Sequence, residues 1–244
     1  MTYFSQQDAD DLTSGQIQDV YNRIDTLHRQ LVTTFKKRDY ELQAYQDVHA
    51  EHLHPASVSS MKSGKMLTLQ YMRLKQKAMT IERLMGRDDV LTTGHIDSRR
   101  HPVIELRLNP SYFAVELILS PDAWWDQQNL AGKLSITRHR KEFFKQLIPL
   151  ETALLGYWEG VHQDEMRIES TRFHPQVLTE WLSTFAPGKD WFRLGVWYPL
   201  ADFALTDDDI HDEITTQISR LYPIYQALLW RSDNNFREFY KAKS

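Results

Sequence analysis

The sequence contains no cysteine, which excludes disulfides, thiolate zinc sites, iron–sulfur clusters and cysteine nucleophiles. Glycine is scarce, at nine of 244 residues, and neither a Walker-type loop nor a G-x-G-x-x-G motif occurs. Phosphate cradles of these kinds need backbone without Cβ atoms, so nucleotide-binding enzymes of these classes are not expected. No serine lies in a G-x-S-x-G motif. The residues therefore identify no enzyme class, and we expect neither a cofactor nor a metal.

The sequence also lacks a long apolar run and a leader. The first residues, MTYFSQQDADDLTSG, are acidic and polar and have no basic stretch or apolar core of a signal peptide. No run approaches the roughly 18–20 apolar residues that span a bilayer. We therefore expect a cytoplasmic protein that makes no contact with membranes.

Positive charge is not in excess, because 29 Lys and Arg stand against 33 Asp and Glu, for a net charge of −4. Such a balance predicts no affinity of the whole surface for polyanions. Any contact with nucleic acid must come from a local basic patch.

Aromatic residues are plentiful at 12% of the chain, which is enough to fill a substantial core. The spacing of the apolar residues changes near residue 90, from the steps of three and four typical of helices to the alternation typical of strands. We therefore predict an α+β protein: a hairpin of long helices over residues 1–90, then an α+β domain over 91–244. In that domain we expect a mainly antiparallel sheet with helices packed chiefly on one face.

The first predicted helix runs from about Ser14 to His54 and carries apolar residues at steps of three and four. This spacing is typical of a coiled-coil seam, so we expect the N-terminal helices to mediate self-association into a homo-oligomer. The seam residues are Ile17, Val20, Ile24, Leu27 and Leu31. A second helix is expected from Leu67 to Met85, with Gly86 as its stop.

A β-hairpin is predicted after Pro102. Two alternating runs, 101–108 and 111–119, flank the turn-favouring pair Asn109-Pro110. Further along, the pattern predicts helices over 121–132, 137–148 and 175–185, strands over 153–158 and 191–198, and a last helix that begins at Thr206.

The two sides of the predicted hairpin differ in character. Ile104, Leu106 and Leu108 share one side, and a mixed polar and aromatic set shares the other. Arginine, tyrosine and tryptophan are enriched in binding hot spots, so we expect this second side to contact a protein partner. The expected contact residues are Arg107, Tyr112, Trp191, Arg193 and Trp197. Three arrangements remain open, in which this side is covered by the N-terminal hairpin, by another subunit or by a ligand.

A metal-dependent nuclease or phosphodiesterase is the alternative function. Asp97, Glu105 and Glu116 would hold Mg²⁺, with Glu105-Leu106-Arg107 on a strand in place of the usual acid-x-lysine pair. Arginine departs from that pattern because its guanidinium cannot act as a base. Charged residues on a solvent-facing sheet side explain the same pattern without catalysis.

Nucleic-acid binding without catalysis is a further alternative. It requires two basic stretches to line up, with the residues Arg99, Arg100, Arg138, Arg140 and Lys141. The second stretch interleaves with Phe143 and Phe144, which is also typical of an ordinary amphipathic helix.

Two smaller features have structural explanations beside functional ones. His49, His52 and His54 are close enough to suggest a metal site, but imidazoles are also common at helix ends. Trp124 and Trp125 are adjacent, so on a helix they point about 100° apart and at most one is centrally buried.

Overall fold

The computed structural model describes residues 2–45, 56–61, 64–150, 152–158 and 167–241. The chain forms two compact units, each assembled from several segments. Unit 1 comprises residues 1–96, 104–115 and 197–219. Unit 2 comprises residues 97–103, 116–196 and 220–244. Residues 1–90 thus fold together with later parts of the chain.

Unit 1 is built on antiparallel strands, in which β3 (Gly64–Met72) is central. It pairs with β1 (Gln43–Ala44) and β2 (Ala56–Met61), and on its other side with β4 (Val103–Leu108). The first half of β5 (Tyr112–Leu119) follows β4 in the strand order. In the β3–β4 register Gln70 lies opposite Glu105.

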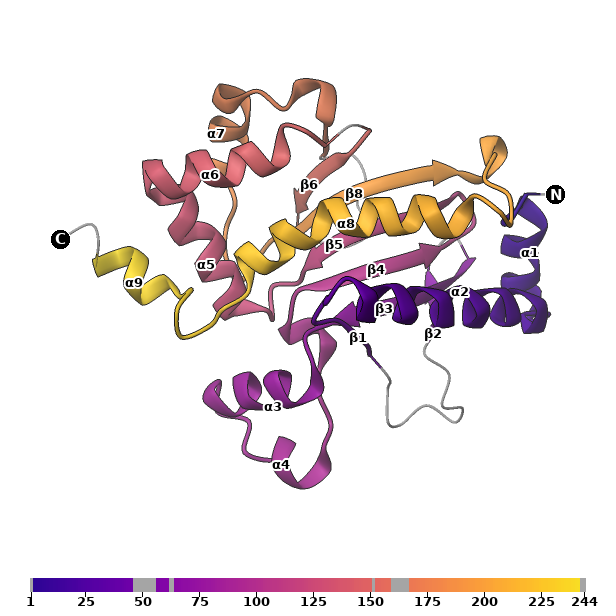
Figure 1. Cartoon of the computed structure of the whole chain (residues 1–244), viewed down its shortest axis with the longest axis horizontal. Coiled ribbons are helices and arrows are strands. Elements are labelled where there is room, and N and C mark those ends of the chain that lie inside the picture. Colours follow the sequence, from indigo (N-terminus) through magenta and orange to yellow (C-terminus); the bar gives the residue numbers. More distant parts are fainter. Residues whose placement is uncertain (1, 46–55, 62–63, 151, 159–166, 242–244) are drawn as a thin grey trace. The chain divides into compact units, whose positions relative to one another are not determined.

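The helix α2 (Gln18–Lys37) supplies the apolar layer of unit 1 (Figure 1). Its Phe35 ring meets the edge of Tyr71 in β3, with centroids 4.9 Å apart. His28 Nδ1 lies 3.1 Å from the Tyr71 hydroxyl. The N-terminal part of α8 (Ile210–Leu228) lies beside α2, since Thr34 Oγ1 is 3.1 Å from His211 Nε2. The apolar sides of α2 and β3 therefore form one core.

The helix expected from about Ser14 to His54 is too long, because α2 ends at Lys37 and Asp39 then adopts a positive φ of 55°. The end of the expected helix, from residue 46 on, lies outside the described residues. A further helix, α1 (Gln6–Ser14), precedes it and was not predicted; Gly15, with φ at +89°, caps α1 in a left-handed conformation that favours glycine. The expected helix from Leu67 to Met85 is likewise wrong in its first part, because residues up to Met72 form β3. Only α3 (Lys75–Leu84) is helical, and the short α4 (Val90–Thr93) follows it.

Unit 2 contains the second half of β5, which is followed in the strand order by β8, β6 and β7. The strands β6 (Leu154–Trp158) and β7 (Arg167–Glu169) pair antiparallel, and β6 also pairs with β8 (Trp191–Pro199). Its helices are α5 (Trp124–Ser135), α6 (Thr137–Leu147), α7 (Pro175–Ser183), the end of α8, and α9 (Phe236–Lys241). Short 3₁₀ turns lie at Ser98–Arg100, Ser170–Arg172 and, in unit 1, Leu200–Asp202.

The α+β class is confirmed, with helices α1 and α2 preceding an antiparallel sheet. The predicted β4–β5 hairpin is also confirmed, and its turn is held by the Asn109 side chain. The Asn109 amide oxygen accepts hydrogen bonds from the backbone of Ser111 at 2.8 Å and of Tyr112 at 2.9 Å. Every residue of β4 and β5 is buried, so both sides of this hairpin are covered within the chain.

Candidate functional site

A continuous row of contacts runs along the polar side of the unit 1 strands. The Gln70 amide donates a 2.7 Å hydrogen bond to Glu105 Oε2, and Glu105 Oε1 accepts from Arg107 Nη1 at 3.3 Å. The Arg107 guanidinium carbon lies 5.5 Å from the centre of the Tyr112 ring, and Nη2 lies 3.4 Å from its hydroxyl. Tyr112 in turn stacks on Trp197, with centroids 4.7 Å apart. We call these five residues the polar column.

Strand geometry explains why the column lies on one side. Glu105 and Arg107 are two positions apart in β4, so both project opposite to Leu106. Arg107 and Trp197 both contact Tyr112, which places them on the same side of the strands as predicted. Gln70 was not among the expected contact residues, because its segment was expected to be helical.

Burial distinguishes the members of the column. Arg107 is only 1% exposed and Tyr112 9%, whereas Trp197 has intermediate exposure. A buried ion pair is weak evidence for stability, because the desolvation of two charges offsets their attraction. Burying an arginine at this position does, however, set the place and orientation of the ring that stacks on Trp197.

A second buried pair lies in unit 2. Arg193 in β8 binds Glu116 in β5 through three hydrogen bonds, from Nη2 at 2.6 and 2.7 Å and from Nε at 3.0 Å. Both side chains are almost fully buried. Trp191 in the same strand has intermediate exposure.

The expected contact residues therefore fall into two classes. Arg107 and Arg193 are covered within the chain, which is one of the arrangements left open above, and each is buried with a glutamate as its partner. On one side of a sheet, two neighbouring side chains of opposite charge can pair and be buried together. The alternation of apolar and polar residues along a strand does not reveal such a pair. Trp191 and Trp197 remain accessible in part.

The carboxylates of the nuclease alternative are engaged separately. Glu105 lies in unit 1 with Gln70 and Arg107, whereas Glu116 and Asp97 lie in unit 2. Asp97 caps the turn at Ser98–Arg100 and binds Arg99. Burial raises the pKa of Asp97, but hydrogen bonds from Arg99 and the charges of Arg99 and Arg100 outweigh it and lower the pKa overall. Within the residues described by the structure, no group of three or more potential ligands is placed to hold a metal ion. His49, His52 and His54 lie outside the described residues.

The basic residues of the nucleic-acid alternative have different surroundings. Arg99 and Arg100 both pair with Asp97, and Arg99 also lies 3.9 Å from Asp122. In α6, Arg138 and Lys141 are exposed, while Phe143 and Phe144 are buried, as expected for an amphipathic helix. Arg140 has intermediate exposure and lies against the end of α5.

The seam residues of α2 have a place in the core. Val20, Ile24, Leu27 and Leu31 are buried within the single chain, and Ile17 lies just before the helix with intermediate exposure. Self-association through these residues stays a prediction, but their side chains already have apolar partners in unit 1.

The adjacent tryptophans diverge as predicted. Trp125 packs against Trp230 with ring centroids 4.5 Å apart, while Trp124 meets the edge of Phe236 at 5.8 Å. Trp124 remains 43% exposed. Its ring lies near Gly188, where a Cβ would meet the ring at an ordinary contact distance of 3.5 Å, so the φ of +80° alone favours glycine there.

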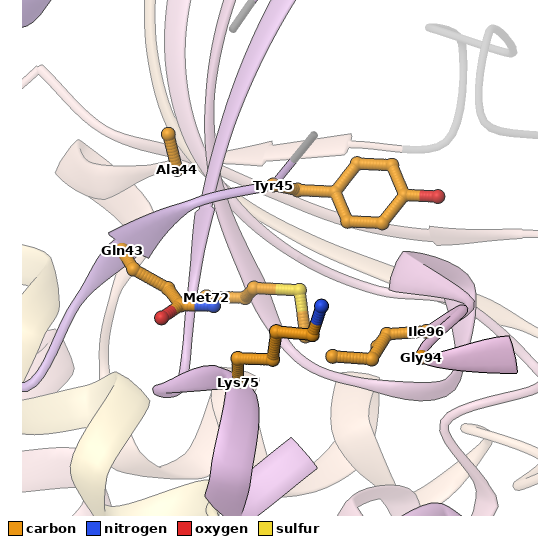
Figure 2. A pocket seen from close by; sticks show the side chains of 7 residues that line it. All are labelled: Gln43, Ala44, Tyr45, Met72, Lys75, Gly94 and Ile96. Atoms are coloured by element: carbon orange, nitrogen blue, oxygen red, sulfur yellow. The ribbon is translucent and has the colours of Figure 1, made fainter. Parts of the chain in front are cut away.

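Unit 1 also contains a small hollow, lined by residues 43–45, the end of β3, the first turn of α3 and the segment after α4 (Figure 2). Its volume is about 100 Å³. The lining residues are Gln43, Ala44, Tyr45, Met72, Lys75, Gly94 and Ile96. Because small-molecule sites are typically about 300–1,000 Å³, this hollow is too small for a metabolite.

The comparisons with known proteins add no identity. The chain matches no family model, and no curated protein is similar to it in sequence. Among the helices that the structure describes, none is long and apolar enough to cross a membrane.

Proposed function

We propose that this chain is a non-catalytic cytoplasmic binding protein, and that unit 1 contacts a protein partner at the Trp197 end of the polar column. The observation that carries the proposal is the stack of Tyr112 on Trp197, backed by the Arg107 guanidinium. Arginine, tyrosine and tryptophan are the residue types that dominate binding energy at protein interfaces.

Preorganisation supports the proposal. Tyr112 is held from behind by Arg107, and Arg107 is oriented by Glu105, which also accepts a hydrogen bond from Gln70. A ring fixed in this way loses little conformational freedom when a partner binds, so more of the contact energy appears as affinity. Gln70 and Trp197, at the two ends of the column, are its partly exposed members, and Trp197 is the aromatic one that we expect a partner to contact.

The surroundings of the acids favour binding over metal-assisted hydrolysis. Glu105, Glu116 and Asp97 each bind an arginine, which neutralises the charge that a divalent cation would need. The proposal does not use the α2 seam, because four of its five residues lie in the core of unit 1.

The test is quantitative capture from a cytoplasmic extract on the immobilised full-length chain, analysed by mass spectrometry. Three forms are compared: the unmodified chain, Trp197→Ala, and Trp124→Ala as a control with an exposed tryptophan in unit 2. We expect a protein retained by the first and third forms and depleted about 30-fold by Trp197→Ala, the loss that matches a hot spot of about 2 kcal/mol. The retained protein is then purified and its binding titrated directly.

Identical sets of retained proteins on all three forms contradict the proposal. Trp197→Phe keeps an aromatic ring and guards against loss of folding, and we expect it to retain an intermediate amount. Thermal unfolding of each variant confirms that the captured differences come from folded chains.

A further inference from the structure

The small hollow of unit 1 has two buried apolar side chains in its wall. They are Met72, at the end of β3, and Ile96, in the segment after α4, and they are 1% and 7% exposed. Together with residues 43–45 they line a space of about 100 Å³. A metabolite of ordinary size does not fit, but because an apolar cavity of about 150 Å³ holds benzene, a group of about four or five non-hydrogen atoms does.

A lysine crosses this hollow. Lys75 is the first residue of α3, and its ammonium lies 3.5 Å from the position that a Cβ would occupy on Gly94. In Figure 2 the Lys75 side chain extends across the hollow, so that the ammonium points between Met72 and Ile96. The positive charge is therefore held beside the apolar wall, although Lys75 as a whole is exposed.

Neither Lys75 nor Gln43 uses its polar end within the described part of the chain. The Lys75 ammonium makes no ion pair or hydrogen bond there, and the side-chain amide of Gln43 makes no hydrogen bond. Solvation accounts for a lysine that extends away from the protein, but it does not account for an ammonium that turns toward Gly94. The hollow thus combines one unpaired cation, one unpaired amide and an apolar wall.

The neighbouring lysine of α3 shows what Lys75 lacks. Lys75 and Lys77 both lie in the first turn, where the positive end of the helix dipole disfavours a cation, and this turn contains no acid. The Lys77 ammonium pairs with both oxygens of the Glu41 carboxylate at 2.6 Å. Among the described residues, no carboxylate does the same for Lys75. An anion in the hollow would compensate its charge in the same way.

The number and kind of groups in the hollow select the anion. A phosphate group carries about two negative charges and three acceptor oxygens, more than one ammonium and one amide can satisfy. A carboxylate has a single charge and two oxygens, which match the Lys75 ammonium and the Gln43 amide. Its carbon chain would contact Met72 and Ile96, and the five non-hydrogen atoms of propionate are about as many as the space admits.

We propose that this hollow binds a carboxylate carried on a short apolar chain, with one oxygen accepting from the Lys75 ammonium and the other from the Gln43 amide. Two sources have this chemistry: a free acid of the size of propionate, and the C-terminal residue of a polypeptide with a small apolar side chain. The site needs no catalytic group, and it is independent of the proposed contact at Trp197.

The test is a titration of the isotope-labelled full-length chain with sodium propionate, followed by two-dimensional NMR. We expect the largest shifts in the backbone amides of residues 43–45, 75–77 and 94–96. The dissociation constant should be on the order of 1 mM, because a ligand of so few atoms has a low ceiling of affinity. Propionamide keeps the shape without the charge, and Lys75→Met keeps the side-chain length without the ammonium. Each change should weaken binding at least about tenfold, since the charge-assisted hydrogen bond is lost.

Lys77→Met is the matched control, because Lys77 lies in the same turn, is 53% exposed and pairs with Glu41. We expect it to change the affinity for propionate less than about threefold, as for an exposed ion pair. Trp197→Ala should leave binding unchanged, which separates this proposal from the proposed function. Thermal unfolding of each variant confirms that folded chains are compared.

A tripeptide that ends in alanine distinguishes the two sources, with a free C-terminus in one sample and an amidated one in another. The free tripeptide should bind more tightly than propionate if a polypeptide end is the ligand, and more weakly if a free acid is. The proposal is overturned by absence of shifts in the three segments up to about twenty times the expected dissociation constant. It is also overturned by equal binding of propionamide, by equal losses for Lys75→Met and Lys77→Met, or by phosphate binding more tightly than propionate.

Discussion

The rings of Tyr112 and Trp197 lie almost parallel, 4° apart in orientation and 4.7 Å between centroids, although 85 positions of sequence separate them. Tyr112 begins β5 and Trp197 lies near the end of β8, and the two positions meet in unit 1. This stack ends the polar column at a partly exposed aromatic ring, which is why the proposed contact with a partner is placed there.

The stack should be measurable as a coupling energy. In a double-mutant cycle with Tyr112→Ala and Trp197→Ala, we expect a coupling of about 0.5–1.5 kcal/mol, the range for aromatic pairs beyond their burial. Urea unfolding of the four forms gives the value. A coupling of zero would mean that the rings are adjacent without stabilising one another.

Leu27 distinguishes a core role of α2 from a role in assembly. We expect Leu27→Ala to lower the free energy of unfolding by about 2–5 kcal/mol, because the side chain is fully buried in unit 1. The loss should not depend on protein concentration, since stability held by an oligomer varies with concentration. Leu84→Ala, at a position 55% exposed, is the control and should cost little. A fall in solution mass on Leu27→Ala would instead support the coiled-coil seam.

Removing one partner of the Glu116–Arg193 pair should lower the free energy of unfolding strongly, whereas replacing both partners by apolar residues should change it little. Arg193→Met leaves the Glu116 carboxylate buried without its three hydrogen bonds, and we expect a loss of about 3–5 kcal/mol. Glu116→Leu combined with Arg193→Met removes both charges and should lie much closer to the original stability. Chemical unfolding of both variants provides the comparison, and a double variant less stable than the single one would contradict this account.

Gln127 is a structural link within unit 2. Its amide nitrogen donates to the carbonyls of Ser120 and Asp190, both at 2.8 Å, and its oxygen accepts from the Gly188 backbone at 2.6 Å. Gln127→Leu leaves the buried Ser120 carbonyl without its hydrogen bond, and it also removes two bonds to the more accessible backbone groups of Asp190 and Gly188. Because one buried unsatisfied group costs about 1–3 kcal/mol, we expect a loss in that range. Gln128→Leu, at the half-exposed neighbour, is the control and should change stability by less than about 1 kcal/mol in thermal unfolding.

Tyr3 should make the stability of the folded chain depend on pH in the alkaline range. Burial raises its pKa to about 12, against an opposing effect of the Arg23 charge, and its hydroxyl donates to the Arg23 carbonyl at 2.7 Å. In the unfolded chain the Tyr3 hydroxyl loses its proton near pH 10, whereas in the folded chain it keeps the proton up to about pH 12. The stabilisation that Tyr3 contributes is therefore fully present below pH 10 and is lost as the pH rises from 10 to 12. Relative to Tyr3→Phe, the original chain should lose at most about 2.7 kcal/mol over that interval in unfolding titrations. A constant difference between the two forms would contradict the shift.

Local pattern was enough to predict several elements. The steps of three and four from Val20 to Leu31 predicted a helix with an apolar stripe, which we assigned to a coiled-coil seam; α2 is that helix, and it buries the stripe within the chain. Asn109-Pro110 between two alternating runs predicted the β4–β5 hairpin, because an Asn side chain holds such a turn without help from distant residues. The two sides of that hairpin were also predictable, since strand side chains alternate by geometry.

Periodicity failed where one segment satisfied two periods. Leu67, Tyr71 and Leu74 fit a helix, but Leu67, Leu69 and Tyr71 equally fit a strand. Pairing of β3 with β4 decides between them, because it satisfies the backbone of both strands, and that partner lies more than thirty positions away in sequence.

The sequence by itself determined the helical face of α2, the hairpin and the α+β class, because those depend on spacing within a few turns or strand positions. Only the tertiary structure decided that the α2 stripe meets its own sheet, that Arg193 finds Glu116, and that Lys133 reaches the turn of Arg231. Each of these contacts joins residues that are far apart in sequence. Which distant segments pack together is decided by the packing of the whole unit and not by the local preferences of the residues.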